Sequence, residues 1–284
     1  MELGFFERAL IEAVLAGGVA GLVGTFVVLR RRAFFTTALT HATFPGAMVA
    51  TILGVSVILG AAVFSILLVA IMTAIARTRG QGGQVAAGVV LTFGFALGAL
   101  LQSANPSLPI DVEGFLVGSI LTVGWDDVAL TGIMFAIAAV IIVLRGRHLV
   151  FSTVDELGYR AAGYRPWVAE ATIVALIAGT VVVIMPAIGA ILAIALIVGP
   201  AVAARQLVSS TNAVLVLAPL LGAASAVIGV IASRELSIAA GGAITVVIAV
   251  VVGIAVVIGR MLPSRRADTV RSQPSATPRT LVGT

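Results

Sequence analysis

The sequence contains no cysteine and no lysine. Without cysteine the chain can have no disulfide, no thiolate metal site and no cysteine nucleophile. Without lysine it cannot contain a Walker A phosphate loop, G-x-x-x-x-G-K-[ST]. An H-E-x-x-H zinc motif is missing as well. We therefore do not expect the chain itself to be an enzyme, and any ATP-driven step would need a nucleotide site on another subunit.

Charged residues are also scarce. They make up 10% of the chain, against 60% hydrophobic residues, and the mean hydropathy is +1.20. A soluble domain would carry about 25% charged residues. We therefore expect an all-α bundle of about eight or nine transmembrane helices in contact with membrane lipid. The net charge of +5 does not indicate a nucleic-acid partner, because the arginines stand between apolar runs, where they determine topology.

Apolar runs with at most one charged residue define the expected spans, and charged or turn-forming residues separate them. Pro186 is expected to divide the long run between Glu170 and Arg205. The second run is short for a crossing, which takes about 20 residues. We predict nine spans: Ala9–Leu29, Ala42–Leu53, Val57–Ala76, Val85–Leu101, Val128–Leu144, Val168–Met185, Ile188–Ala204, Ala213–Ala232 and Ala240–Gly259.

The distribution of arginine predicts the orientation, because cytoplasmic loops carry the excess of positive charge. With the N-terminus outside and the C-terminus in the cytoplasm, only Arg8 and Arg234 lie on the outer side. We expect a multi-pass protein of the cell membrane with a transmembrane domain over residues 1–262. Residues 263–284, rich in Ser, Thr, Pro and Arg, are expected to form a disordered cytoplasmic tail. Glycines at small-residue spacing, Gly17, Gly21 and Gly24, are expected to permit close helix packing.

His41 is the most informative single residue, because it lies in a stretch from Ala33 to Ala76 without Asp, Glu, Lys or Arg. An ionisable group in such a segment suggests a function in transport, although a neutral imidazole bonded to a neighbouring helix is the structural alternative. Thr37 and Thr40 precede it, and only Thr37 is expected to share its helix face. Pro45 and Gly46 follow at once and predict an interrupted helix beside a cavity.

Two loops carry further candidates. The loop from Gln102 to Asp127 is expected to be interfacial or re-entrant, and its Asp111 is either a solvated carboxylate or a place where a cation enters. Asp126 and Asp127 are expected to cap the following span. The loop from Arg145 to Pro166 is expected to contain a short helix that ends at Gly163. That loop is either an ordinary connector or a docking surface for a partner with a nucleotide site.

Several segments, in order, resemble the permeases of the ABC-3 family over about residues 5 to 260. They are Gly24–Arg31 ("GTFVVLRR"), Ala38–Ala42 ("ALTHA") with Pro45 and Gly46, Val112–Leu121 ("VEGFLVGSIL") after Asp111, Phe151–Gly163, and Ile188–Leu192 through Pro200–Arg205.

The resemblance implies a homodimeric importer of zinc, manganese or iron that works with a separate ATPase and an extracytoplasmic metal-binding protein. It places His41 and Asp111 on the translocation path, together with the positions of Thr37, Thr40 and Ser237. It assigns ATPase coupling to a segment that includes Asp155, Glu156, Arg160, Ala161 and Gly163.

The sequence departs from the family pattern at two positions. Thr37 stands where an aspartate is usual, four residues before the histidine, and Ser237 stands where the family commonly has the aspartate of a D-x-x-x-G pattern. Two negative charges that would offset a divalent cation are therefore absent. One alternative is a permease for a metal chelate or another small solute. Another is a secondary transporter, against which the small number of intramembrane acids argues.

Overall fold

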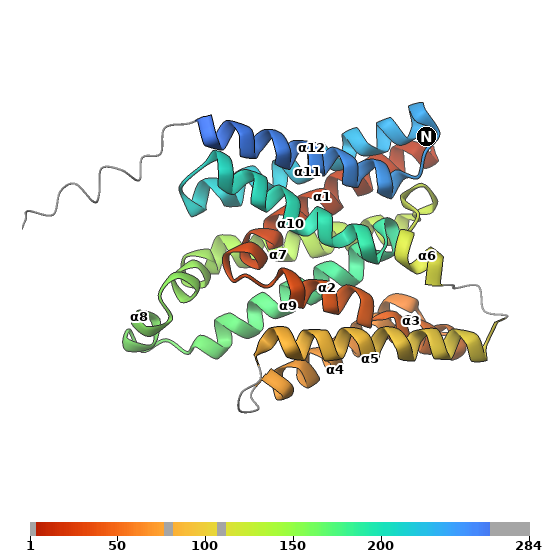
Figure 1. Ribbon diagram of the computed structural model, residues 1–284, viewed down its shortest axis with the longest axis horizontal. Helices are drawn as coiled ribbons and strands as arrows, with labels where there is room; N and C mark the ends of the chain where they lie inside the picture. The colour runs from red at the N-terminus through yellow and green to blue at the C-terminus, as the bar shows by residue number, and fades with distance from the viewer. Residues whose placement is uncertain (1–3, 77–81, 107–111, 262–284) are drawn as a thin grey trace, which may run out of the picture.

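The computed structural model describes residues 4–76, 82–106 and 112–261, and the secondary structure of this part of the chain is helical throughout. Figure 1 shows the helices lying roughly side by side. They are α1 (Phe5–Leu29), α2 (Ala33–Ala42), α3 (Phe44–Ile52), α4 (Val57–Ala76), α5 (Gly83–Ala104), α6 (Val112–Val117), α7 (Trp125–Val154), α8 (Glu156–Ala161), α9 (Pro166–Ile188), α10 (Ala190–Leu207), α11 (Thr211–Leu236) and α12 (Ala240–Met261), with a 3-10 turn, η1, at Ile120–Thr122.

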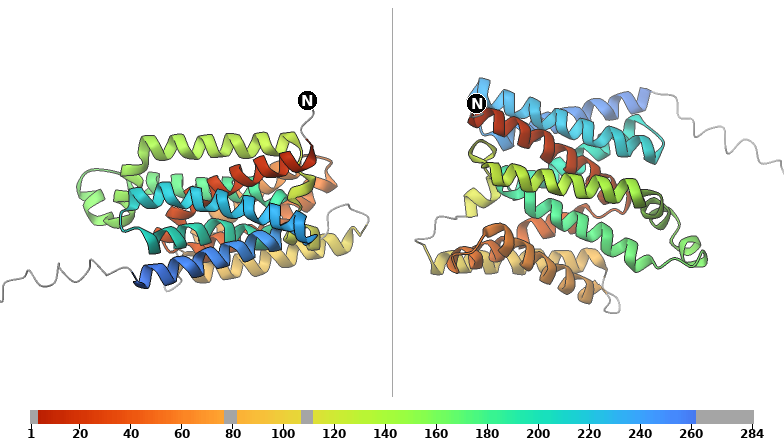
Figure 2. Two further views of the ribbon diagram at one scale, coloured as in Figure 1. Left: turned by 90° about the horizontal axis from the view of Figure 1, so that it is seen from above. Right: turned by 180° about the vertical axis from the view of Figure 1, so that it is seen from behind.

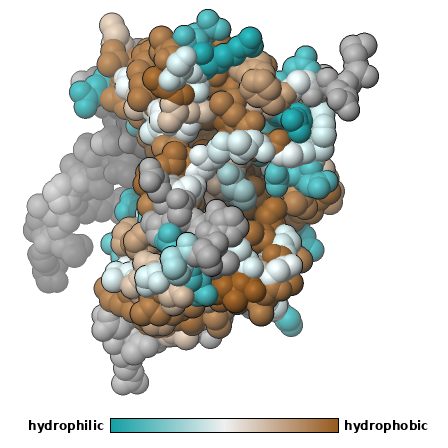
Figure 3. All heavy atoms as spheres, turned by 90° about the vertical axis from the view of Figure 1, so that its right-hand side faces the viewer, coloured by the Kyte–Doolittle hydropathy of each residue, from teal (hydrophilic) through white to brown (hydrophobic). Residues whose placement is uncertain are grey.

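Eight of these helices are long and apolar enough to cross a membrane: α1, α4, α5, α7, α9, α10, α11 and α12. This confirms the expected all-α polytopic fold. Hydrophobic side chains such as Val63, Ile66 and Val143 are exposed on their outer faces, as lipid-facing positions require. Figure 3 views the end of the bundle near α6, where hydrophilic residues are scattered among hydrophobic areas that continue onto the sides.

The predicted span over Ala42–Leu53 is wrong. The segment is split between two short helices, because α2 begins at Ala33 and ends at Ala42, and α3 begins at Phe44. Pro45 lies in the first turn of α3, where a missing N–H costs nothing and the fixed φ favours a new helix start. The two helices follow each other along the bundle beside α5 and α10 (Figure 1). Together they replace the short second span of the prediction.

Helix α1 lies in the centre of the bundle and packs against α11, α10 and α7 (Figure 2). A Cβ added at Gly17, Gly21 or Gly24 would overlap backbone atoms of Gly222, Ala218 or Ile197 respectively. Glycine therefore sets the distance between α1 and its neighbours, as the spacing predicted.

The backbone also makes a close approach at the break between α9 and α10. The helix is interrupted at Gly189, which has φ 86°, rather than at Pro186, which lies within α9. A Cβ on Gly189 would overlap the backbone of Val117, and one on Gly118 would overlap that of Gly189. The segment from α6 to Val123 is thus packed against the bundle, with Ile120 and Val123 buried. Whether it is interfacial or re-entrant stays a prediction.

Helix α7 is longer than the predicted span, because it continues from Leu144 to Val154. Hydropathy ended the span at the first arginine, whereas the helix extends beyond it toward α8. The backbone N–H of Gly124 donates to Asp127 at 3.0 Å, which confirms the predicted cap. The C-terminal ends of α7, α10 and α12 and the whole of α8 lie at one end of the bundle (Figure 1). We call it the basic end, because it carries Arg145, Arg147, Arg160, Arg165, Arg205 and Arg260.

The packing of α1 predicts that the stability cost of an added methyl group depends on where the glycine lies. Gly21→Ala should lower the free energy of unfolding by about 1–3 kcal/mol, because the backbone of α11 must move. Gly253→Ala is the matched control, since its Cβ would meet nothing within 4 Å. The measurement is the thermal unfolding midpoint of each variant in detergent. Equal midpoints for the two variants would contradict the packing argument.

Candidate functional site

His41 lies in the last turn of α2, directly before the break at Thr43. Its side chain is half-buried, and its ring centroid is 6.4 Å from that of Phe95 on α5. Phe44, the first residue of α3, packs against Phe115 of α6 in a tilted arrangement with centroids 4.6 Å apart. The interruption therefore places the imidazole beside α5, and the next helix begins in contact with α6.

The hydrogen bonds around the ring determine which nitrogen is free. The Thr40 hydroxyl donates its proton to the backbone carbonyl of Thr37 at 2.8 Å. Its oxygen lies 3.0 Å from Nδ1 of His41, and while the single hydroxyl proton is donated to the carbonyl, this oxygen can only accept from Nδ1. This network favours the tautomer with the proton on Nδ1. The lone pair of Nε2 is then available to a ligand, as in histidines that bind metals.

Thr37 lies one turn before His41 on α2, so the two residues share a helix face, as expected. The Thr37 hydroxyl donates to the carbonyl of Ala33 at 3.0 Å, and the hydroxyl that lies beside the ring is that of Thr40. The role of Thr37 in transport stays a prediction. Thr43 continues the pattern by donating to the carbonyl of Thr40 at 3.1 Å.

Of the other predicted path residues that the structure describes, Thr40 lies beside His41 and Ser237 does not. Ser237 is exposed in the turn between α11 and α12, where it has φ 52° and caps α11. The helices that surround α2 are α5, α9 and α10. Asp111 lies outside the described residues. In residues 4–76, 82–106 and 112–261, no group of three or more His, Cys, Asp or Glu side chains could hold a metal ion.

The second candidate region is α8, which forms the short helix expected before Gly163. The Asp155 carboxylate accepts from the backbone N–H of Gly158 at 2.8 Å and caps the helix. Arg160 pairs with Glu156 one turn away at 2.6 Å, with both side chains exposed. Ala161 is the last helical residue, and Gly163 has φ 82°. Such an exposed pair contributes little to stability, so both charges are available to a partner.

Sequence reasoning missed the aromatic cluster that fixes α8. Tyr159 is buried, its ring stacks on Tyr164 with centroids 4.9 Å apart, and His148 of α7 meets Tyr164 edge-on at 4.9 Å. His148 thus lies within α7 and belongs to this cluster. A signal existed, because these are the only two tyrosines and one of the two histidines of the chain.

A buried acid was also missed. Glu12 of α1 is fully buried and accepts a hydrogen bond from Thr131 of α7 at 2.8 Å, while its second oxygen has no partner in the described structure. Its position inside the predicted span Ala9–Leu29 was the available signal. The contact joins α1 to α7 near their N-terminal ends.

The interrupted helix, the lone imidazole and the anchored α8 define a polytopic membrane transport protein. The chain belongs to the ABC 3 transport family, since the sequence model of that family matches residues 2–259. It is thus a permease of the ABC transporter class.

Individual relatives match along nearly the whole chain. A protein of Treponema pallidum named zinc transport system membrane protein TroC is 33% identical over 268 residues, covering 91% of this chain and 89% of that protein. The manganese transport system membrane protein MntC of Listeria monocytogenes is 29% identical and covers 90% of this chain and 91% of its own length. Among solved structures, PsaBC of Streptococcus pneumoniae in complex with Fab has a TM-score of 0.83, 28% identity and coverage of 95% and 96% of the two chains.

The cap of α8 yields a testable prediction. Asp155→Ala should destabilise the helix by about 1 kcal/mol, whereas Asp155→Asn should be nearly neutral because asparagine caps equally well. Amide hydrogen exchange of the peptide covering residues 156–161 measures the difference. Faster exchange in the alanine variant alone is expected, and equal protection in all three proteins would show that the cap does not hold α8.

Proposed function

We propose that this chain is the membrane permease of an ATP-driven importer of a divalent transition metal, with zinc, manganese and iron as the candidate cargoes. The observation that carries the proposal is the half-buried His41 at the break between α2 and α3. The chain that contains it is a permease of the ABC 3 transport family. The ions named for the relatives, zinc and manganese, fit an imidazole nitrogen with oxygen donors better than soft copper(I) does.

The metal is a cargo that passes His41 and is released. A single imidazole with threonine oxygens binds an ion more weakly than a closed site of three or four ligands. Weak binding suits transport, because an ion must leave the site as readily as it enters. Asp111 is proposed to contact the ion at the outer side, and Ser237, exposed at the same end of the bundle as α6, to contribute an oxygen at the mouth.

ATP is proposed to act through a separate ATPase subunit that docks on α8. The missing Walker A lysine excludes the common phosphate loop from this chain, and the exposed charges of Glu156 and Arg160 give α8 a polar docking face. The family of the chain and its likeness to PsaBC support this assembly. We further propose two copies of the permease around a central path and an extracytoplasmic binding protein that delivers the metal.

The orientation follows from the positive-inside rule. The basic end of the bundle, with α8, is proposed to face the cytoplasm, and the N-terminus is proposed to lie outside. The end of α12 also lies at the basic end (Figure 1), so the C-terminus would be cytoplasmic.

One observation favours a second cargo class. Thr37 and Ser237 carry no charge where the family pattern usually has aspartates, so less negative charge offsets a divalent ion. A metal chelate or another small solute would need less compensation. Transport that is unaffected by removing free metal with a chelator would support this second candidate.

The proposal predicts the effect of removing the imidazole. In metal-limited cells that express the candidate partners, His41→Ala should lower the accumulation of one of the three metals by about 10- to 100-fold, the usual loss when metal-site contacts are altered. Elemental mass spectrometry of the cells measures manganese, zinc and iron together. Thr92→Ala is the matched control, because that threonine is exposed on the neighbouring helix α5.

Normal metal accumulation in the His41→Ala strain would show that His41 is not needed on the transport path. If deletion of the whole chain also left all three metals unchanged, the cargo assignment would fail and the chelate alternative would take its place.

A further inference from the structure

A partly buried polar cluster at the basic end joins three helices that are far apart in the sequence. Arg30, directly after α1, donates from Nε to the Thr153 hydroxyl at 2.9 Å and from a terminal nitrogen to the Ser152 hydroxyl at 2.8 Å. Its other terminal nitrogen forms an ion pair with Glu170 of α9, and Arg32 pairs with the second oxygen of the same carboxylate. We call these five residues the arginine–glutamate cluster.

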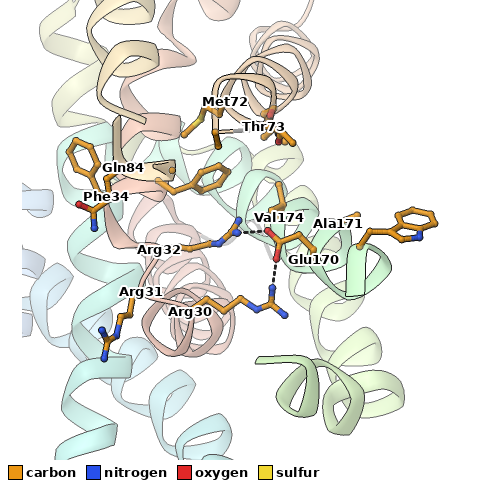
Figure 4. A pocket seen from close by; sticks show the side chains of 15 residues that line it. Arg30, Arg31, Arg32, Phe34, Met72, Thr73, Gln84, Glu170, Ala171 and Val174 are labelled. Carbon is orange, nitrogen blue, oxygen red and sulfur yellow. Dashed lines mark hydrogen bonds and ion pairs between the residues drawn. The ribbon is translucent and has the colours of Figure 1, made fainter. Parts of the chain in front are cut away.

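Figure 4 shows Arg30 and Arg32 converging on Glu170, whereas Arg31 between them points away. Arg31 has φ 53°, an uncommon conformation for a residue with a side chain. This local turn brings the side chains on both sides of Arg31 to one carboxylate. The α1–α2 connection is thus shaped around Glu170.

The two hydroxyls are held as acceptors. Ser152 and Thr153 both donate their own protons to the carbonyl of Leu149, at 2.9 and 2.6 Å. Their lone pairs therefore face Arg30, whose planar guanidinium donates in fixed directions. The Arg30 side chain is 13% exposed. Burial lowers the pKa of its guanidinium and the Glu170 charge opposes that shift, so Arg30 keeps its charge.

The position of the cluster links the two candidate regions. Ser152 and Thr153 form the last turn of α7, directly before the cap of α8 at Asp155. Arg32 is the N-cap of α2, the helix that carries His41 near its other end. Because α2 is short and interrupted at Thr43, a shift of its first residue is transmitted along one rigid helix to the imidazole.

We infer that the arginine–glutamate cluster transmits the movement of α8 to the His41 segment, with Arg30, Arg32 and Glu170 as positioning residues for transport. The inference depends on the proposed function, since it takes α8 to be the element that the ATPase moves. Replacing a buried ion pair by apolar residues is often neutral or stabilising, so simple stability does not account for a carboxylate shared by two arginines.

The space beside Glu170 permits such a movement. A cavity of about 570 Å³ borders the cluster and is lined also by Phe34, Met72 and Trp167. The carboxylate is one-third exposed on that side. A displaced Glu170 can therefore remain solvated while its arginine partners shift.

The test uses the full complex of this chain with its ATPase in proteoliposomes, with manganese and zinc as probes and with metal transported per ATP hydrolysed as the readout. Glu170→Gln keeps the size of the side chain and removes its charge. We expect a fall in this ratio of about tenfold while ATP hydrolysis continues, in the range found for residues that carry coupling. Arg260→Gln is the control, because it removes one exposed arginine at the same end of the bundle, on α12, outside both the cluster and α8. It should leave the ratio within about twofold.

A second variant and a second readout keep the inference open to refutation. Arg30→Lys keeps the charge but cannot donate to both hydroxyls and the carboxylate, so the ratio should fall here too. Because the chain has no cysteine, a variant with Phe34 and Val154 both replaced by cysteine can carry two spin labels at defined positions. ATP should change their distance distribution in the wild type, and Glu170→Gln should abolish that change.

The outcomes separate the two proposals. No metal transport by the wild-type complex would refute the cargo, whatever the variants do. Wild-type transport together with a normal ratio in Glu170→Gln or Arg30→Lys would refute the coupling role of the cluster. Failure of both variants to assemble with the ATPase would also refute it, because the cluster would then serve assembly of the complex.

Discussion

The structure depends on one constraint of the membrane interior, where every backbone polar group needs a partner within the protein. An interrupted helix can exist there only if nearby groups satisfy the freed carbonyls. At the break between α2 and α3, Thr40 and Thr43 donate to backbone carbonyls of α2. At the break between α9 and α10, the backbone of Ser119 donates to Pro186. These bonds satisfy backbone carbonyls beside each break, which makes the interruptions compatible with a bundle of apolar spans.

The same principle organises the basic end. A buried guanidinium needs several acceptors, and Arg30 finds them on α7 and α9 rather than on its own helix. The Arg30 charge, which is costly to bury, thereby links the ends of α1 and α7 to α9. Tyr159 and His148 fix α8 to α7 by aromatic packing. The helix α8, which is proposed to contact the ATPase, is therefore attached to α7, whose last turn contains Ser152 and Thr153 of the cluster.

The sequence was sufficient to predict the eight long spans from hydropathy, and the cap at Asp127 and the helix before Gly163 from residue type. Each of these features is determined by residues close together in the chain. Hydropathy was insufficient for Ala42–Leu53, where the apolar run hides the helix start at Pro45 and an earlier helix from Ala33. The pairing of Arg30 with Glu170 joins residues 140 positions apart, and no local pattern contains it. The burial of Glu12 had a local signal in its position inside an expected span, but its partner Thr131 lies 119 positions away and no local pattern identifies it. The roles of Asp111, Ser237 and α8 in transport stay predictions.

The central claim is that this permease moves an uncomplexed divalent metal past His41. The most direct measurement is ATP-dependent uptake of manganese and zinc into proteoliposomes that contain the chain, its ATPase and the metal-loaded binding protein. The account predicts uptake of one of the two ions that requires ATP and stops when a chelator captures the free metal. Uptake of a metal–chelate complex in place of the free ion would contradict it.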